Sequence, residues 1–197
     1  MEIKQKRFSN SSLFQFLNED LKFTGKDQSG TYTFSVKYGS IPANTSELIE
    51  RNVWFRNAGI LWALIGSLQI GLHYRDFGGF GGGFWFLVGL ICLGIYGVAK
   101  TKYTVFNTDK GRIYVVKNKD HDHIISEISS RRKEQLFSWY GELDFSNDPN
   151  AELDKFRWLM SEGVIGEVEY TRVVEKLKSY HQNQELQNTQ SHNETLN

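Results

Sequence analysis

The hydrophobic residues of this chain are concentrated in two stretches that carry no charged side chain. The first is residues 57–74, eighteen positions between Arg56 and Arg75, and the second is residues 77–99, twenty-three positions between Asp76 and Lys100. Helices of these lengths would measure roughly 27 and 34 Å, and the hydrocarbon core of a bilayer is about 30 Å thick. The pattern therefore predicts a transmembrane helical hairpin over residues 57–99. The alternative is a hairpin buried inside the protein, but so small a domain has little chain to cover helices that are apolar on every side.

A glycine-rich run, residues 78–83, could form either a phosphate-binding loop or part of a packed helix. No register of the run completes G-x-G-x-x-G, and no Gly-Lys-Ser/Thr follows it, so the sequence favours helix packing. Small residues that recur every four positions let two helices approach closely, although glycine is also simply common in membrane helices. The predicted packing residues are Gly59, Ala63, Ser67, Gly71, Gly79 and Gly83.

Basic residues flank the predicted hairpin at its two ends. Arg51 and Arg56 precede the first helix, and Lys100 and Lys102 follow the second. The positive-inside rule then predicts a multi-pass protein of the inner membrane with both termini in the cytoplasm. A basic surface facing anionic lipid is predicted with these residues. Its members are Arg51, Arg56, Lys100, Lys102, Arg131, Arg132 and Lys133, although an ordinary solvated helix face explains the last three equally well.

Alternation with a period of two predicts strands on either side of the hairpin. Residues 30–41 alternate aromatic and aliphatic side chains with Thr, Ser and Lys, which is typical of a strand with one buried face. Residues 103–106 and 112–116 are two further β-prone runs joined by a turn that contains Asp and Gly, and they predict a β-hairpin. The predicted β-rich module therefore covers residues 21–56 and 100–145.

Two amphipathic helices are predicted around this module. Residues 1–20 contain Ser and Asn caps followed by leucines and phenylalanines, which predicts a short N-terminal helix. Helical spacing begins again at Asp120, with Ile128 and Leu136 on one side of a helix that closes the module. Arg132 falls close to that apolar side, so we expect it either to pair with a carboxylate or to extend its head to solvent.

This order of strands, two apolar helices, more strands and a closing helix resembles small bacterial membrane proteins with a pleckstrin-homology-like domain. The resemblance covers residues 21–140 and rests on the pattern of elements, because no signature motif is present. It implies a cytoplasmic β-rich module, split by the hairpin, that lies close to the bilayer. It implies no specificity for a lipid head group.

A second resemblance begins at "AELDKFRWLMSEGVIGEVEYTRVVEKL", within residues 150–179, where two short helical patterns flank Gly163. This segment resembles the short C-terminal helical-hairpin module known as SHOCT, and the resemblance implies a role in association. Some thirty residues cannot bury an adequate core, so the module must dock on its own protein or on a partner. The predicted partner-binding residues are Leu153, Phe156, Leu159, Ile165, Tyr170, Val174 and Leu177. Residues 180–197 are rich in Gln and Asn and predict a disordered tail.

Composition adds few functional clues. The 23 basic and 23 acidic residues cancel and no binding motif appears, so nucleic acid is not an expected partner. The single cysteine, Cys92, lies in an apolar stretch and gives no sign of an oxidising compartment. "DHDH", residues 120–123, could hold a divalent ion, but aspartates at the start of a helix explain it adequately. No catalytic motif is present, so no enzyme, cofactor or metal is predicted.

Together these patterns predict an α+β membrane protein. A two-helix transmembrane hairpin is inserted in a small antiparallel β module with a C-terminal helix, and a short helical hairpin follows. The predicted function is that of a non-enzymatic integral inner-membrane protein that associates with itself or with another membrane protein, with the lipid bilayer as its surroundings. The alternative is a small transport or accessory subunit of a membrane complex, in which Ser67 and Gln69 line a polar path. The sequence leaves the identity of any small-molecule ligand open.

Overall fold

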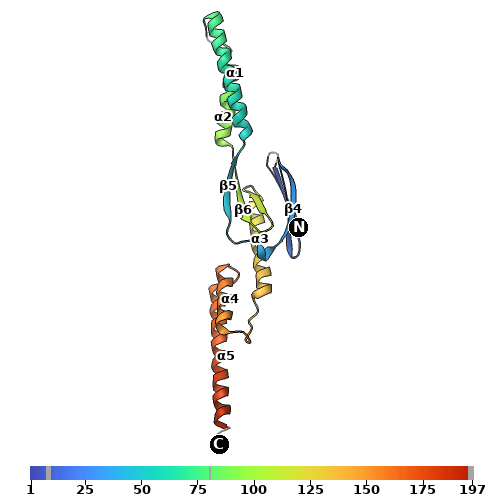
Figure 1. The fold of residues 1–197 in the computed structure, drawn as a ribbon, viewed down its shortest axis with the longest axis vertical. Coiled ribbons are helices and arrows are strands. Elements are labelled where there is room, and N and C mark those ends of the chain that lie inside the picture. Colours follow the sequence, from blue (N-terminus) through green and yellow to red (C-terminus); the bar gives the residue numbers. More distant parts are fainter. Residues whose placement is uncertain (8–9, 80, 195–197) are drawn as a thin grey trace. The chain divides into compact units, whose positions relative to one another are not determined.

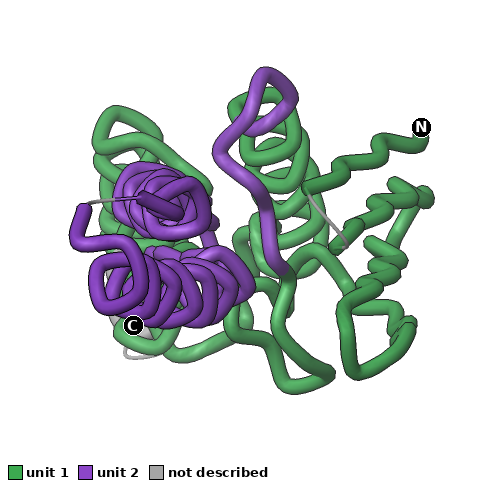
Figure 2. The backbone as a smooth tube through the Cα atoms, turned by 90° about the horizontal axis from the view of Figure 1, so that it is seen from above, with its two compact units in different colours: residues 1–44, 106–113, 122–197 green, residues 45–105, 114–121 purple. Residues whose placement is uncertain are grey.

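The computed structural model of the chain describes residues 1–7, 10–79 and 81–194 and divides into two compact units. The first unit holds Met1–Asn44, Phe106–Ile113 and Asp122–Asn197, and the second holds Thr45–Val105 and Tyr114–His121 (Figure 2). The second unit therefore interrupts the chain of the first, and each unit is described separately below.

The first unit begins with a four-stranded antiparallel sheet in which each strand pairs with the next along the chain. Its strands are β1 (Glu2–Arg7), β2 (Asn10–Phe16), β3 (Asp20–Asp27) and β4 (Gly30–Lys37), in the order β1-β2-β3-β4. The turn between β3 and β4 is held by Asp27, whose carboxylate accepts hydrogen bonds from the backbone N–H groups of Ser29 (2.7 Å) and Gly30 (3.2 Å). The strand expected within residues 30–41 is confirmed as β4, and a short 3₁₀ turn, η1 (Tyr38–Ser40), follows it.

The N-terminal helix predicted over residues 1–20 is wrong, because this segment contains β1 and β2. In β2 the buried side chains are Ser12, Phe14 and Phe16, which alternate with partly exposed ones as in a strand. The β3 residues Leu21 and Phe23 continue the same buried face, and the rings of Phe14 and Phe23 lie 5.3 Å apart. Pairing with a neighbouring strand thus decides the structure of this segment.

Helix α3 (His121–Tyr140) covers apolar side chains of the first unit with one face. Its buried residues are Ile124, Ile128, Arg132 and Leu136, which are spaced by four and so lie along one side of the helix. The helix expected from Asp120 onward is therefore confirmed.

The second unit is built on strands β5 (Ser46–Arg51), β6 (Lys100–Asn107) and β7 (Arg112–Val116), arranged in the order β5-β6-β7. Strands β5 and β6 are antiparallel, from Ser46 opposite Val105 to Arg51 opposite Lys100. The strands β6 and β7 confirm the β-hairpin expected over residues 103–116. The last pair of residues is the place where a helical hairpin enters and leaves the sheet.

That hairpin consists of α1 (Val53–Phe77) and α2 (Phe84–Val98), which run side by side (Figure 1). The side chain of Asn52 caps α1 by accepting a hydrogen bond from the backbone N–H of Trp54 (3.0 Å). Gly78 ends α1 with a φ of 68°, and Gly82 has a φ of 75°. Both values favour glycine, so the glycine-rich run forms the turn between the helices and not the start of the second helix.

Within the part of the chain that the structure describes, no helix combines the length and the apolarity needed to cross a membrane. The turn takes up residues 78–83, so α2 has 15 residues and a length of about 22 Å, well below the 30 Å of a hydrocarbon core. Helix α1 has 25 residues, but these include Arg56, Gln69 and His73. The predictions of a transmembrane hairpin, an integral inner-membrane protein with cytoplasmic termini, and a transport or accessory subunit of a membrane complex are therefore wrong. The fold is α+β with two antiparallel sheets.

The chain ends with helices α4 (Pro149–Ser161) and α5 (Glu167–Glu194). The carboxylate of Asp148 caps α4 by accepting hydrogen bonds from the backbone N–H groups of Asn150 and Ala151. Gly163, with a φ of 66°, lies in the turn between the two helices. Helix α5 extends to Glu194, so the disordered tail expected from residue 180 is helical that far, and residues 195–197 lie outside the described residues.

Candidate association surfaces

The two helices of the hairpin meet through glycines that bring their backbones close together. A Cβ atom added to Gly89 would lie 2.5 Å from the backbone nitrogen of Ala63, and one added to Gly59 would lie 2.8 Å from Cγ of Leu93. At Gly66 an added Cβ would collide with the backbone nitrogen of Phe86. Any side chain at these positions would push the helices apart, so the glycines determine the distance between α1 and α2.

The predicted packing residues are only partly those that the structure brings together. Gly59 and Ala63 lie in the contact, whereas Gly71 and Gly79 would meet nothing within 4 Å if a Cβ were added, and Gly83 has only ordinary contact with Ile70. Ser67 is exposed, and its hydroxyl donates to the backbone oxygen of Ala63 in its own helix (2.8 Å).

Two contact glycines were missed by the prediction, Gly66 and Gly89. The signal for Gly66 was its seven-residue distance from Gly59, which corresponds to two helical turns. The sequence also gave no sign of the stacked Trp62 and Trp85 rings, whose centroids lie 4.3 Å apart at an angle of 15°.

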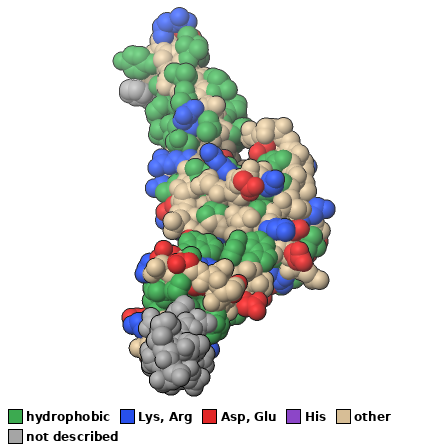
Figure 3. Space-filling view, turned by 60° about the horizontal axis from the view of Figure 1, so that its bottom comes forward, with side chains coloured by type: hydrophobic (Ala, Val, Ile, Leu, Met, Phe, Trp, Pro, Cys, Tyr) green, Lys and Arg blue, Asp and Glu red, His purple; other side chains and the backbone are tan. Residues whose placement is uncertain are grey.

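The outer faces of the hairpin carry large apolar side chains that remain exposed after the two helices have packed. Figure 3 shows hydrophobic side chains spread over this part of the molecule on the face it presents. On α1 they are Ile60, Leu61, Leu64, Leu68 and Leu72, and on α2 they are Phe84, Leu87, Leu90, Ile91 and Ile95. Leu64 is 65% exposed and Leu87 is 57% exposed, although leucine is among the residues most often buried in proteins.

The residues predicted to bind a partner through α4 and α5 mostly serve the protein's own core. Phe156, Leu159, Ile165 and Leu177 are buried in one cluster with Val173 and with Leu136 of α3. Leu153 and Tyr170 are partly buried against that cluster, and Val174 is half-buried. The module thus docks on its own chain, which was one of the two expectations, and the four fully buried side chains among the predicted residues belong to that internal contact.

Arg132 connects this module to the first sheet. Its guanidinium is buried, donates from Nε to the backbone oxygen of Ile41 (2.6 Å) and from an NH group to the backbone oxygen of Glu162 (3.2 Å), and forms an ion pair with the Glu162 carboxylate. The expectation that Arg132 would pair with a carboxylate is confirmed. Because its charge is used inside the protein, Arg132 does not contribute to a basic surface.

The other residues of the predicted basic surface differ in their surroundings. Arg131 donates to the Glu127 carboxylate (2.7 Å) and to the backbone oxygen of Leu17 (2.9 Å), and the hydrogen bond with Glu127 raises the pKa of the Arg131 guanidinium. In the second unit, the Arg51 guanidinium lies 5.7 Å from the centre of the Tyr96 ring. The remaining four, Arg56, Lys100, Lys102 and Lys133, are exposed.

A second buried charge stabilises the start of α4. The Glu152 side chain is 3% exposed and accepts hydrogen bonds from Lys155 Nζ (2.7 Å), Asn147 Nδ2 (2.9 Å) and the backbone N–H of Asp144 (3.3 Å). Burial alone raises the pKa of the Glu152 carboxyl, but the hydrogen bonds from Lys155, Asn147 and Asp144 outweigh it and hold the pKa below its usual value.

The "DHDH" segment is placed at the start of α3. The His121 ring nitrogen Nε2 lies 2.8 Å from the Thr104 hydroxyl oxygen, so a second side chain already positions this ring. Among the described residues, no three His, Cys, Asp or Glu side chains are grouped closely enough to hold a metal ion.

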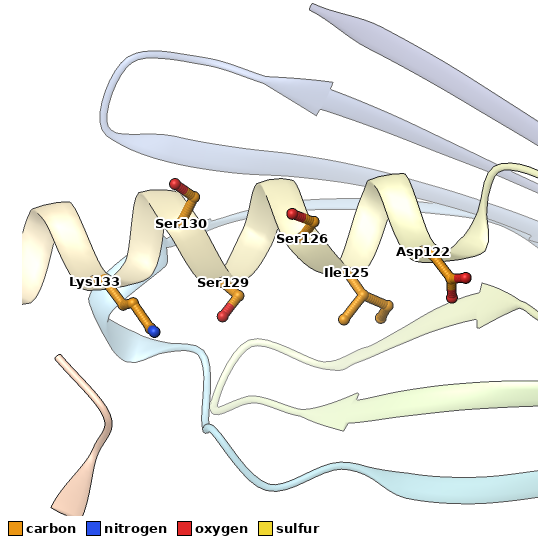
Figure 4. A pocket seen from close by; sticks show the side chains of 6 residues that line it. All are labelled: Asp122, Ile125, Ser126, Ser129, Ser130 and Lys133. Atoms are coloured by element: carbon orange, nitrogen blue, oxygen red, sulfur yellow. The ribbon is translucent and has the colours of Figure 1, made fainter. Parts of the chain in front are cut away.

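Helix α3 also borders an open hollow of about 440 Å³. Its lining residues are Asp122, Ile125, Ser126, Ser129, Ser130 and Lys133 (Figure 4). All six belong to one helix, and in Figure 4 Ser126 and Ser130 point away from Asp122 and Lys133. A ligand site needs polar groups that converge on a common point from different elements, so this hollow carries no chemical assignment.

No family model, curated protein or solved structure matches this chain. The structural observations alone therefore guide the functional assignment.

Proposed function

We propose that this chain is a non-catalytic association protein whose hairpin α1–α2 is the docking element. The observation that carries the proposal is the set of apolar side chains exposed on both outer faces of the hairpin. Contiguous apolar surface of this kind is rare on monomeric proteins and marks places where another molecule binds. Burial of such side chains against a partner removes them from water and so favours association.

The absence of charge from the two central stretches of the hairpin supports a protein surface of matching chemistry as the partner. Residues 57–74 and 77–99 contain no Asp, Glu, Lys or Arg. A partner with charged groups opposite this surface would have to desolvate them without compensation, which is costly. We therefore expect the partner surface that covers α2 to be uncharged.

The pattern of elements is consistent with the two resemblances, which we carry forward as part of the proposal. Strands before and after the hairpin, followed by the helix α3, support the pleckstrin-homology-like resemblance, and the two helices α4 and α5 on either side of Gly163 support the SHOCT resemblance. In this reading the β module and the C-terminal hairpin form a scaffold. Within the second unit, strands β5 and β6 carry the hairpin α1–α2, and the scaffold takes no part in chemistry.

The proposal is tested by the mass of the protein in solution, measured by light scattering during size-exclusion chromatography. The monomer mass is 22.8 kDa, and we expect a larger mass for the natural chain. A double variant, Leu64→Glu with Leu87→Glu, places a charge on each outer face of the hairpin and is expected to return the mass to 22.8 kDa. The matched control is Val168→Glu, which introduces the same charge at an exposed valine of α5 (75% exposed) and is expected to change nothing. A natural chain that is monomeric at every concentration would overturn the proposal.

A further inference from the structure

The contacts between α1 and α2 fix the position of every residue along the long axis of the hairpin, and we call this position its height. Gly59 faces Leu93, Ala63 faces Gly89, and Gly66 faces Phe86. Each step forward along α1 is therefore matched by an equal step backward along α2. Continued to the outer faces, the same register places Leu61 level with Ile91 and Leu68 level with Phe84, and it places Leu64 within one residue, about 1.5 Å, of the level of Leu87.

These level pairs form two seams on opposite sides of the hairpin. Leu61, Leu64 and Leu68, the α1 seam, are spaced by three and four residues and lie on the side of α1 that faces away from the contact at Gly59, Ala63 and Gly66. Phe84, Leu87 and Ile91, the α2 seam, have the same spacing and lie on the side of α2 away from Gly89. Spacing by three and four residues is the pattern of helices that pack side by side in bundles. All six side chains are more than half exposed.

We propose that the α1 seam of one copy packs against the α2 seam of a second copy. The hairpins then lie side by side, and because each contact joins two different surfaces it is of the heterologous, or head-to-tail, kind. The inference rests on the proposed association function and names its partner. Copies related by rotation about an axis along the hairpin keep every residue at its own height, so Leu61 meets Ile91, Leu64 meets Leu87 and Leu68 meets Phe84 of the neighbour. The two seams of one chain thus match each other in length, height and chemistry.

Symmetry decides between this arrangement and a two-fold dimer. A two-fold pair of hairpins joined through their α1 seams would cover those seams and leave both α2 seams in water. A head-to-tail contact is heterologous, and its repetition covers both seams of every copy when the assembly closes into a ring. The exposed side chains on both sides of the hairpin therefore favour the head-to-tail contact.

Disulfide trapping between full-length copies tests the contact. In a Cys92→Ser background, which removes the single natural cysteine, one preparation carries Leu64→Cys and another carries Leu87→Cys. A disulfide requires Cα atoms about 4.4–6.8 Å apart, so oxidation of the mixture is expected to give about tenfold more linked dimer than oxidation of either preparation alone. The matched control combines Leu61→Cys with Phe84→Cys. These two positions lie on the same seams but differ in height by seven residues, about 10 Å, and are expected not to link.

The outcomes separate the inference from the proposed function on which it rests. Efficient linking of Leu64→Cys copies to one another would establish a two-fold contact through α1 and overturn the head-to-tail arrangement, while association itself would stand. A larger mass in solution without any of these links would place the partner surface elsewhere and also overturn the inference. No link together with a monomeric mass would overturn both.

Discussion

A single guanidinium, that of Arg132, joins three segments that are distant in the sequence. It contacts Ile41 after the first sheet and Glu162 at the end of α4, and it lies on the buried face of α3. Loss of one partner from such a buried pair leaves the other charge without compensation, which typically costs 3–5 kcal/mol.

The Arg132→Ala variant is therefore expected to lower the free energy of unfolding by about 3 kcal/mol or more, measured by urea denaturation. The neighbouring exposed residue provides the control, because Lys133→Ala removes the same charge with an expected change within about 0.5 kcal/mol. If Arg132→Ala changes the free energy of unfolding as little as is expected for Lys133→Ala, the Arg132 contacts contribute nothing to stability.

Glu152 gives the protein a dependence on pH. Its folded-state pKa is lowered, so the ionised carboxylate contributes stability above the pKa of the unfolded chain, about 4.3, and this contribution is lost as the pH falls through the lower folded-state value. We expect Glu152→Gln to destabilise the protein by about 2 kcal/mol at neutral pH and by much less in acid, below the folded-state pKa. Denaturation curves at a series of pH values check this, with the exposed Glu175→Gln as control. A destabilisation that is the same at all pH values would contradict the role of the charge.

The sequence predicted the environment of Arg132 but not its partner. The spacing from Ile128 and Leu136 showed that Arg132 lies beside an apolar stripe, and a buried arginine needs an acceptor. Glu162 lies 30 residues away, directly after helix α4, and only the fold brings it within reach. The buried role of Glu152 has the same origin, since its acceptor oxygens are satisfied by a turn that precedes α4.

At the scale of elements, the glycines of α1 should respond in opposite directions to the same substitution. Gly66→Ala places a Cβ against the backbone of Phe86 and is expected to lower the stability of the hairpin by 1 kcal/mol or more, by the usual magnitude of overpacking, about 1–3 kcal/mol. Gly71→Ala has open space around the new Cβ and is expected to raise helix stability by up to about 1 kcal/mol. Thermal unfolding followed by circular dichroism measures both. If the two variants behave alike, the close contact at Gly66 does not hold the helices together.

Helices were easier to predict than strands, and the reason is physical. The long runs 53–77 and 84–98 form helices on their own hydrogen bonds, and the sequence showed both. Their length was overestimated because the absence of charge was used to set the ends, whereas the positive φ of Gly78 and Gly82 places a turn inside the uncharged stretch. The segment that contains Phe14 and Phe16 fits a helical and a strand period alike, and it becomes β2 only by pairing with β1 and β3.

For the whole molecule, association predicts that stability rises with concentration. A partner that binds only the folded state stabilises it by mass action, so the unfolding midpoint of the natural chain should increase over a hundredfold range of protein concentration. The corresponding gain in the free energy of unfolding is about 2 to 3 kcal/mol if the chain passes from weakly to fully associated. The Leu64→Glu variant should have a midpoint that does not change with concentration, while Val168→Glu should behave like the natural chain. A constant midpoint for all three would exclude association that is coupled to folding.

The hairpin α1–α2 is inserted between two paired strand ends of the second sheet, so another segment could replace it. Arg51 and Lys100 are directly opposite each other in the ladder of β5 and β6, so the chain leaves and returns at adjacent points. The entropic cost of closing a loop grows only slowly with its length, and the sheet therefore places little constraint on what is inserted there. A short β-turn or a longer helical hairpin would satisfy β5 and β6 equally well. The same sheet could thus acquire, lose or replace the proposed docking hairpin during evolution while the rest of the fold stays unchanged.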